Sequence, residues 1–515
     1  MSSLGKLCIV LLAFTSISLS AQSGSTYYVS KSGSNNNSGS FTAPWLTIQH
    51  AANTVTAGAT VYVGSGVYNE SVNFPSSGTA SSYITFENYP GQNPVIDGTG
   101  LTPSGTQGLV NIVNQSYLTV SGFEIRNYTT SKAAVTPAGI WVTGSGSGLN
   151  LLNNIVHNIT TTTEKNGNAF GIAVYGTSST PITNLTISGN QVYSLKTGQS
   201  ESVNVDGNVT YFSITNNIVH DNDNIGIDAI GFEGVGPTGD DQAKYGEVSG
   251  NTVYNISGIH NPGEGNSYDA DGLYCDGCAY VVFERNTVYA CDLNMEAASE
   301  HKGHSSSYVT IRNNIFYDAN TVGISIGGYS NTVGASDHVV IVNNTLYNNN
   351  NTKSEGAVFQ IQFHSGSASG NIFENNIVYA GTQNVWIYSF VKGTSTYPAP
   401  PATMNWNLYY STAGYVSGTS IDWAGKSNYK TYTAYQSGAG EDANSPNANP
   451  LFDNLGSNPP NLDVATNSPA VNAGSTSLTC SVGYCNGSSI YGSTDFAGNP
   501  RINSSGQINI GAYEQ

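Results

Sequence analysis

The most regular feature of the chain is a short strand pattern that ends in an asparagine. Apolar and polar residues alternate, as in Leu185 to Ile187, and an Asn and a second short apolar piece follow. The asparagines of this repeat are Asn154, Asn190, Asn217, Asn251, Asn286, Asn314, Asn344, Asn376 and, more loosely, Asn407. Their intervals of about 27 to about 36 residues are too variable for helix pairs but suit stacked coils with loops of different size. The pattern predicts the successive turns of a parallel β-solenoid.

An asparagine suits a sharp bend between two strands. It tolerates the left-handed backbone conformation that such a bend requires, and its amide both donates and accepts hydrogen bonds. Stacked in successive coils, these side chains can form a hydrogen-bonded ladder along the inside of the bend. The alternative is an all-β sandwich with many Asn turns, but the turns of a sandwich would not share one sequence pattern.

Each coil also carries a second strand in which apolar residues alternate with residues of other kinds. Because strand side chains alternate between two faces, we expect the apolar members to point into the core and the residues between them to point outward. One outward column then reads Trp141, Ala173, Asn204, Asp228, Tyr274, Glu296, Ser325 and Trp386, with Gln360 and Gln362 in the coil before Trp386. A second column, two residues along, reads Tyr175, Asp206, Ile230, Asp276, Ala298, Gly327 and Tyr388.

Both ends of the solenoid need a cover. Residues 44–57 place Trp45, Ile48, Ala52 and Val55 on one helical face, which predicts a short capping helix with Thr42 as its N-cap. After Asn407 the pattern loosens, and residues 411–515 lack the apolar periodicity of a separate core. We therefore expect a β-helix over residues 22–410 and a C-terminal capping region over residues 411–515.

Composition agrees with this fold class. Charged residues make up only 9% of the chain, whereas Gly reaches 59 and Tyr 33, which favours turns and strands over helices. A solenoid grows by adding coils, so 515 residues still fit one domain. The formal net charge of −18 argues against nucleic acid or an anionic membrane as a partner.

The chain begins with features of a secretory signal. Lys6 and the apolar run from Leu7 to Phe14 precede small residues at Ser18, Ser20 and Ala21, which predicts a signal peptide over residues 1–21. The run is too short for a membrane span, and no later segment qualifies. We expect a secreted or periplasmic monomer.

The ends of the chain resemble a known superfamily. The segments GSFTAPWLTIQHA, GVYNE and VIDG near the start, and NPLF, SPAVNAG, DFAGNPR and IGAYE near the end, resemble secreted right-handed parallel β-helix proteins of the pectate-lyase-like superfamily. The resemblance implies an all-β, right-handed parallel β-helix of about 10–12 coils. It leaves the activity open, because that superfamily includes lyases, glycoside hydrolases, epimerases and glycan-binding proteins.

Five cysteines remain after removal of the signal. Cys480 and Cys485 are expected to form a small disulfide in the C-terminal region. Cys275, Cys278 and Cys291 lie in adjacent coils and could give one bridge and one buried thiol. A zinc site that combines them with His301 or His304 is an alternative that their spacing does not favour.

The outward columns have acidic residues at the centre and aromatic residues toward both ends, a pattern typical of a carbohydrate-binding groove. Aromatic rings can stack on sugars, and coils about 4.8 Å apart suit a polymer lying along the solenoid. The alternative is that these are ordinary surface residues of a sheet. The candidate substrate-binding residues are Trp141, Tyr175, Asn204, Asp228, Tyr274, Gln360, Gln362 and Trp386.

The strongest catalytic candidates are two carboxyl groups. Glu296 lies in mid-strand beside Tyr274, and Asp276 lies one coil away and two residues along, so their backbones should be roughly 8 Å apart. At that distance one carboxylic acid can protonate a glycosidic oxygen while the other activates water. Asp276 followed by Gly277 is also a turn signal, so a purely structural role for Asp276 stays open.

A lyase would use a base and usually a cation. Glu300, His301 and Lys302 follow the Glu296 strand, and Lys302 could be the base if its pKa is depressed. Asp269 and Asp271 could hold calcium, although they and Lys302 could equally be turn and solvated loop residues. No organic cofactor is expected.

Three function classes therefore remain open. We favour a polysaccharide lyase that acts on a uronic-acid polymer with the help of calcium. A glycoside hydrolase with paired carboxylates follows closely, because an acidic protein repels a polyuronate unless cations bridge them. A non-catalytic glycan-binding or surface protein is the third.

Overall fold

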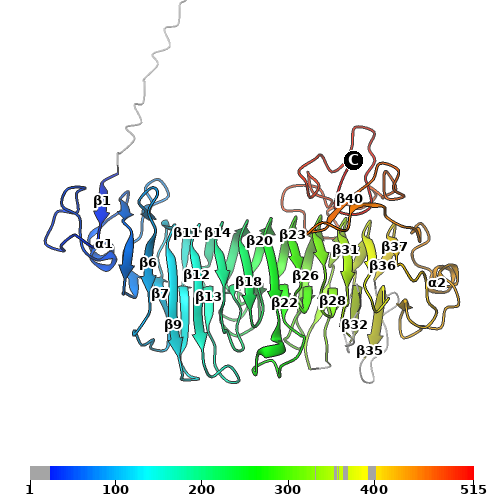
Figure 1. Cartoon of the computed structure of the whole chain (residues 1–515), viewed down its shortest axis with the longest axis horizontal. Coiled ribbons are helices and arrows are strands. Elements are labelled where there is room, and N and C mark those ends of the chain that lie inside the picture. Colours follow the sequence, from blue (N-terminus) through cyan, green and yellow to red (C-terminus); the bar gives the residue numbers. More distant parts are fainter. Residues whose placement is uncertain (1–23, 331, 353–356, 358, 364–368, 392–401) are drawn as a thin grey trace, which may run out of the picture.

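In a computed structural model, the chain winds into an elongated right-handed parallel β-helix of about 12 turns (Figure 1). The structure describes residues 24–330, 332–352, 357, 359–363, 369–391 and 402–515. The predicted signal peptide, residues 1–21, lies outside the described residues. The prediction of the fold class is confirmed.

Within the described residues, three parallel sheets form the walls of the β-helix. Sheet 1 has 14 strands: β1 (Thr26–Val29), β2 (Thr60–Val63), β5 (Ile84–Asn88), β8 (Leu118–Ser121), β11 (Gly146–Leu152), β14 (Ile182–Ser188), β17 (Val209–Thr215), β20 (Lys244–Ser249), β23 (Ala279–Glu284), β26 (Ser305–Arg312), β29 (Ala335–Asp337), β30 (Val340–Val342), β33 (Ile372–Glu374) and β36 (Thr403–Asn405). Sheet 2 has 12 strands: β3 (Gly66–Tyr68), β6 (Pro94–Asp97), β9 (Glu124–Thr130), β12 (Ile155–Thr161), β15 (Gln191–Tyr193), β18 (Ile218–Asn222), β21 (Thr252–Ile256), β24 (Thr287–Tyr289), β27 (Ile315–Tyr317), β31 (Thr345–Asn349), β34 (Ile377–Ala380) and β37 (Leu408–Tyr410). Sheet 3 has 12 strands: β4 (Val72–Phe74), β7 (Thr106–Val113), β10 (Thr136–Thr143), β13 (Phe170–Gly176), β16 (Val203–Gly207), β19 (Ile227–Ile230), β22 (Asp271–Asp276), β25 (Leu293–Ala298), β28 (Val322–Gly327), β32 (Phe359–Phe363), β35 (Ile387–Val391) and β38 (Ile421–Asp422).

The core follows from strand alternation. In sheet 3, Ile140 pairs with Ile172, which in turn pairs with Val203, and all three are fully buried. Each coil thus places apolar side chains directly above those of the coil before. The side chains between them face outward, and these outward positions of sheet 3 build the site described below.

A row of buried asparagines joins the coils at the bend between sheets 1 and 2. Asn154 donates from both its main-chain N and its Nδ2 to Oδ1 of Asn190, at 2.9 and 3.1 Å. The same pair of bonds links each following asparagine of the repeat to the next one, as far as Asn407. Ser445 and Asp442 end the row by bonding the main-chain N and the Nδ2 of Asn407.

The left-handed residue of this bend differs from the predicted one. The asparagines of the row do not have positive φ values, whereas the residue before each of several of them does: Asn153, Asn216, Asn313, Asn343 and Asn375 lie at φ of 53, 55, 56, 57 and 58°. The left-handed conformation and the bonding between coils, which the sequence pattern assigns to one asparagine, therefore belong to two successive residues. The first Asn makes the turn, and the second bonds along the row.

The N-terminal cap is shorter than the sequence predicts. Helix α1 spans Ile48–Thr54, and the side chain of Thr47, not of Thr42, accepts from the N–H of His50. Trp45 cannot join the helix because its N–H and C=O bond to Tyr28 and Ser30 along strand β1. The buried Ile48, Ala51 and Ala52 still cover the end of the core.

The C-terminal region lies over the later coils (Figure 1). It contains helix α2 (Tyr432–Ala439) and the antiparallel pair β39 (Phe452–Asn454) and β40 (Asn461–Val464), and a disulfide joins Cys480 to Cys485. Among the described residues, a short 3-10 helix, η1 (Gly258–His260), is the remaining helical element. None of the helices in the described ranges has the length and apolar character needed to cross a membrane.

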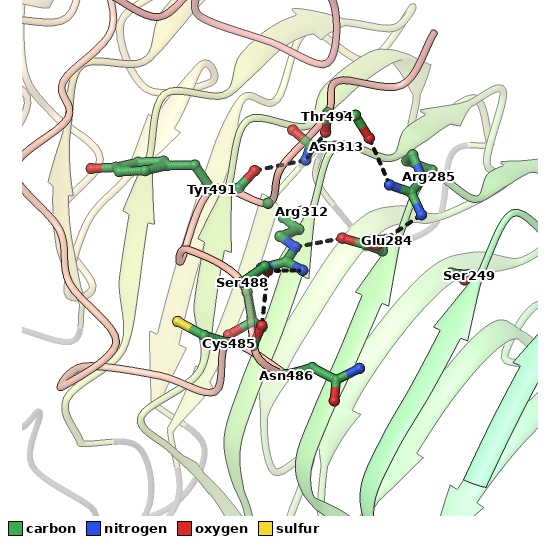
Figure 2. A network of polar contacts seen from close by, with 12 residues as sticks. Ser249, Glu284, Arg285, Arg312, Asn313, Cys485, Asn486, Ser488, Tyr491 and Thr494 are labelled. Carbon is green, nitrogen blue, oxygen red and sulfur yellow. Dashed lines mark hydrogen bonds and ion pairs between the residues drawn. The ribbon is translucent and has the colours of Figure 1, made fainter. Parts of the chain in front are cut away.

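Figure 2 shows how the C-terminal region docks on sheet 1. The buried Arg312 guanidinium pairs with Glu284 at 2.6 Å and donates to the Ser489 carbonyl and the Ser488 hydroxyl. Asn313 donates to the carbonyls of Tyr491 and Thr494. These charge-assisted and amide bonds hold the last segment of the chain against coils that precede it by more than 170 residues.

Replacing one member of the Asn row should destabilise the whole β-helix. Asn286 makes four side-chain hydrogen bonds, to Asn251 N and Nδ2, to the Val248 carbonyl and to Asn314 Oδ1. Asn286→Ala leaves buried main-chain groups unpaired, and we expect it to lower the free energy of unfolding by about 3 kcal/mol in chemical denaturation. Asn150→Ala, which removes a half-buried bond to Thr119, is the control and should cost less than about 1 kcal/mol. Equal losses in the two variants would contradict a special role for the row.

Candidate active site

The candidate residues lie in columns on the outer face of sheet 3. Strand pairing places Asn204, Asp228, Tyr274, Glu296 and Ser325 side by side in successive coils. In the second column, Asp276 pairs with Ile230 on one side and with Ala298 on the other. From β16 to β28, this is the register that strand alternation predicts.

The columns open into a cavity of about 930 Å³. Ten carboxyl groups line it: Glu201, Asp206, Asp228, Glu233, Glu264, Asp269, Asp271, Asp276, Glu296 and Glu300. Tyr175, Tyr268, Tyr274, Tyr329 and Phe170 contribute aromatic rings. Among the residues that the structure describes, no Lys, Arg or His lines the cavity.

The cavity is more enclosed than an open sheet face. Glu296 and Tyr274 were expected to project into solvent, but they are only 7% and 3% exposed. Loops rise around them, and these loops contribute Glu201, Glu233 and Glu264 to the lining. Glu296 therefore has little solvent exposure, although it still borders the cavity.

Asp276 ends strand β22 at a tight corner. Gly277 has a φ of +73°, and a Cβ there would lie 2.8 Å from the Gly231 carbonyl oxygen, so the corner requires glycine. The same Asp276 lines the cavity, and its Oδ1 accepts from the main-chain N of Glu300 at 2.7 Å. Its turn position and its place in the site are compatible.

The three candidate residues in the loop after β25, Glu300 to Lys302, differ in their position relative to the cavity. Glu300 lines the cavity. His301 is half-buried at its rim, where Nε2 lies 2.8 Å from Oε1 of Glu233 and one ligand atom from each of Glu233, Asp276 and His301 falls within 4.8 Å of the others. Lys302 is exposed and does not line the cavity, so its assignment as the base is wrong for this structure.

Aromatic residues extend the site toward the N-terminus. Trp141 lies one coil before Ala173, stacks on Phe170 at 6.1 Å between ring centroids and lies 4.7 Å from the ring of Tyr175. Phe170 and Tyr175 border the cavity, whereas Trp141 lies beyond its edge.

The predicted aromatic end on the other side is wrong. Trp386 is fully buried, and its ring stacks on Tyr409 at 5.9 Å. Asn384, at φ 55°, bends the chain before β35, so that Tyr388 and not Trp386 pairs with Gln360. Gln360 and Gln362 occupy the expected column in β32, opposite Ser325 and Gly327.

Several acidic residues of the cavity were not predicted, because they come from loops. Glu201 precedes β16, Glu233 follows β19 and Glu264 lies between η1 and β22. Strand alternation does not apply to loops. The one available signal is that acidic residues gather in the loops that flank the second strand of successive coils.

The cysteines stabilise the same region. Cys275 and Cys278 form a disulfide across Asp276 and Gly277, and Cys291 is a buried free thiol. Because the disulfide consumes two thiolates, these cysteines do not form the alternative zinc site with His301 or His304.

Crowding and burial make the carboxyl groups hard to ionise. Burial, reinforced by neighbouring carboxylates, raises the pKa values of Glu201, Asp206 and Glu296 to about 8. The pKa values of Asp228, Asp271 and Asp276 also lie well above the ordinary aspartate value, again first because of burial. Groups with such values can hold or release a proton near neutral pH, as acid–base catalysts must.

The chain matches a known family model and is similar to a protein of known sequence. A family model described as "Pel9A-like, right handed beta helix region" matches residues 27–291. The uncharacterized protein YwoF of Bacillus subtilis (strain 168) is 35% identical over 452 residues, which cover 87% of this chain and 93% of that protein.

Two pectate lyases are also similar to the chain, one over part of its length and one over nearly all of it. Pectate lyase PEL9 of Emericella nidulans is 30% identical over 156 residues, or 30% of this chain and 36% of that protein. The crystal structure of pectate lyase Pel9A is 13% identical, covers 96% of this chain and 98% of its own, and has a TM-score of 0.49.

The raised pKa values predict a pH-dependent stability. Burial raises the pKa of Glu296 from 4.5 to about 8, so the folded state holds a proton that the unfolded state releases over this window. Stability should therefore fall as the pH rises from about 5 to about 8, and the thermal midpoint should fall with it. Glu296→Gln cannot ionise, so its thermal midpoint should decline less steeply in the same buffers. Asp453→Asn removes an exposed carboxylate outside the cavity and should keep the wild-type slope. Parallel curves for all three proteins would contradict the environment assigned to Glu296.

Proposed function

The chain belongs to the Pel9A-like right-handed β-helix family, and from this premise we propose that it is an exported polysaccharide lyase that cleaves a uronic-acid polymer in the cavity of sheet 3. The observation that carries the proposal is the cavity on the outer face of sheet 3, which ten carboxyl groups from its strands and loops line. The pectate lyase activity in the name of the relative PEL9 supports the reaction class. Export follows from the signal peptide predicted over residues 1–21.

The donor set fits a hard divalent cation. Asp271 is 4% exposed, and its Oδ1 has no hydrogen-bond partner among the described residues. We propose that Asp269, Asp271 and Asp228 hold calcium, because carboxylate oxygens are the ligands that this ion prefers. Bound there, calcium would offset the charge of the substrate carboxylate and make the neighbouring C–H more acidic.

Glu296 and Asp276 would then move the protons. Ionised Glu296 removes the proton at C5 of the uronic acid, and the C–H electrons form the C4–C5 double bond as the bond from C4 to the glycosidic oxygen breaks. Because its pKa is raised to about 8, Glu296 is a stronger base than an ordinary carboxylate. Asp276, whose pKa lies well above its usual range, supplies a proton to the leaving oxygen. The aromatic rings of Tyr175 and Tyr274 line the path of the polymer.

One observation favours a glycoside hydrolase as the second candidate. Within the described part of the chain, no Lys or Arg lines the cavity to meet a substrate carboxylate, which suits a neutral glycan. In that reaction protonated Glu296 would be the general acid, and a neighbouring carboxylate would activate water.

Product analysis separates these functions. The mature protein is incubated with a panel of polyuronates and neutral glycans, with and without a chelator. We expect unsaturated products that absorb in the ultraviolet, lost when the chelator removes calcium. New reducing ends without that absorbance would instead establish the hydrolase, and retained binding without cleavage would leave a glycan-binding protein.

The role of Glu296 is tested on whichever substrate is cleaved. Glu296→Gln keeps the shape of the side chain but cannot exchange its proton, and we expect kcat to fall by about 10²- to 10⁴-fold. Asp453→Asn, outside the cavity, should retain full activity. Wild-type activity in Glu296→Gln would discard this assignment.

A further inference from the structure

The end of the cavity nearest the N-terminus has a chemistry that the proposed reaction does not use. Glu201 and Asp206, just before and within strand β16, line this end beside Tyr175 and Phe170 of β13, whereas the fully buried Asn204 of β16 does not line it. Tyr175 and Asp206 are direct neighbours across the two strands. The group lies two coils before Asp271 and Asp276.

This group presents acceptors that lack donors. Asp206 is 1% exposed and borders the cavity, yet its Oδ1 has no hydrogen-bond partner in the described ranges. Asn204 is fully buried and does not line the cavity; its Nδ2 donates to Oε2 of Glu201 at 2.7 Å. Buried acceptors without donors are costly, so this arrangement favours a ligand that brings several N–H or O–H groups.

The surroundings favour a positively charged donor. Burial, reinforced by nearby carboxylates, raises the pKa values of Glu201 and Asp206 to about 8, so a cation bound beside them would favour their ionised form. The adjacent wall is aromatic: the rings of Trp141 and Phe170 lie 4.7 and 5.7 Å from that of Tyr175. Carboxylates beside aromatic faces bind ammonium groups well, because a ring face attracts a cation and –NH₃⁺ offers three donors.

We propose that Glu201 and Asp206, with Tyr175 beside them and Asn204 positioning Glu201, form a subsite for a sugar that carries a free, protonated amino group. The inference rests on the proposed function, since it places this sugar in the same polymer as the uronic acid cleaved at Glu296. The substrate class is then a polysaccharide in which a uronic acid lies close to an unacetylated amino sugar. A neutral or N-acetylated sugar would leave the buried carboxylate oxygens without a charged partner.

Three tetrasaccharides with the same β-1,4 backbone test the subsite. Chitosan tetramer carries free amines, chitin tetramer carries acetylated ones and cellotetraose carries hydroxyls at the same carbon. Binding to the mature protein is measured by calorimetry at low salt in a buffer with a chelator. We expect the chitosan tetramer to bind at least about tenfold more tightly than the other two, and salt to weaken that preference.

Two variants test which residues cause the preference for the chitosan tetramer. Asp206→Asn and Glu201→Gln keep the size of the side chain and should each reduce the affinity for the chitosan tetramer by about tenfold. Neither should change the affinity for cellotetraose, which also shows that the variants are folded. Asp453→Asn removes one negative charge outside the cavity and should behave as wild type.

Several outcomes would overturn the subsite. Equal affinity for the three tetramers would do so, as would a preference that survives both Asp206→Asn and Glu201→Gln. A parallel titration with calcium, without the chelator, tests the competing ligand. If calcium displaces the chitosan tetramer, and Asp206→Asn binds one calcium ion fewer than the wild type, the group is a metal site instead. Binding needs no turnover, so absence of cleavage with the amine preference intact would reject the lyase but not the subsite.

Discussion

The stacking of one coil directly on the next is the constraint on which the other features depend. The buried Asn row makes it specific, because each side chain bonds both the main chain and the amide of the adjacent coil. A shift by one residue would break every such bond and turn each inward side chain outward. The row therefore determines which residues of sheet 3 meet on its outer face, although it lies on another bend of the β-helix.

That fixed register brings like charges together. Asp228, Asp271, Asp276 and Glu296 come from three successive strands of sheet 3, and each is at most 7% exposed. Burial, reinforced by neighbouring carboxylates, raises their pKa values and reduces the stability of the folded state near neutral pH. A fold held by many hydrogen bonds along its length can tolerate this local cost. A bound cation would relieve this cost by pairing with the carboxylates.

Strand alternation predicted the site only where the coils are regular. The neighbours Asp228, Tyr274 and Glu296 follow from it, because apolar residues mark the inward positions on both sides of each. It failed for Trp386, where the left-handed Asn384 redirects the chain and the large ring fills the end of the core. It also missed Glu201 and Glu233, since loop side chains have no period, and it did not predict how deeply the loops would bury Glu296.

The irregular spacing of the repeat carries information that alternation lacks. Asn190 and Asn217 are 27 residues apart, whereas the next two intervals are 34 and 35 residues. The longer intervals contain the loops after β19 and before β22, which contribute Glu233, Glu264 and Asp269 to the cavity. Because successive coils must stay in register to stack, extra residues leave the coil as loops. In this chain two such enlarged loops wall the same stretch of sheet 3. The coils thus set the positions of the strand carboxylates, and the enlarged loops of these two intervals add Glu233, Glu264 and Asp269 to them.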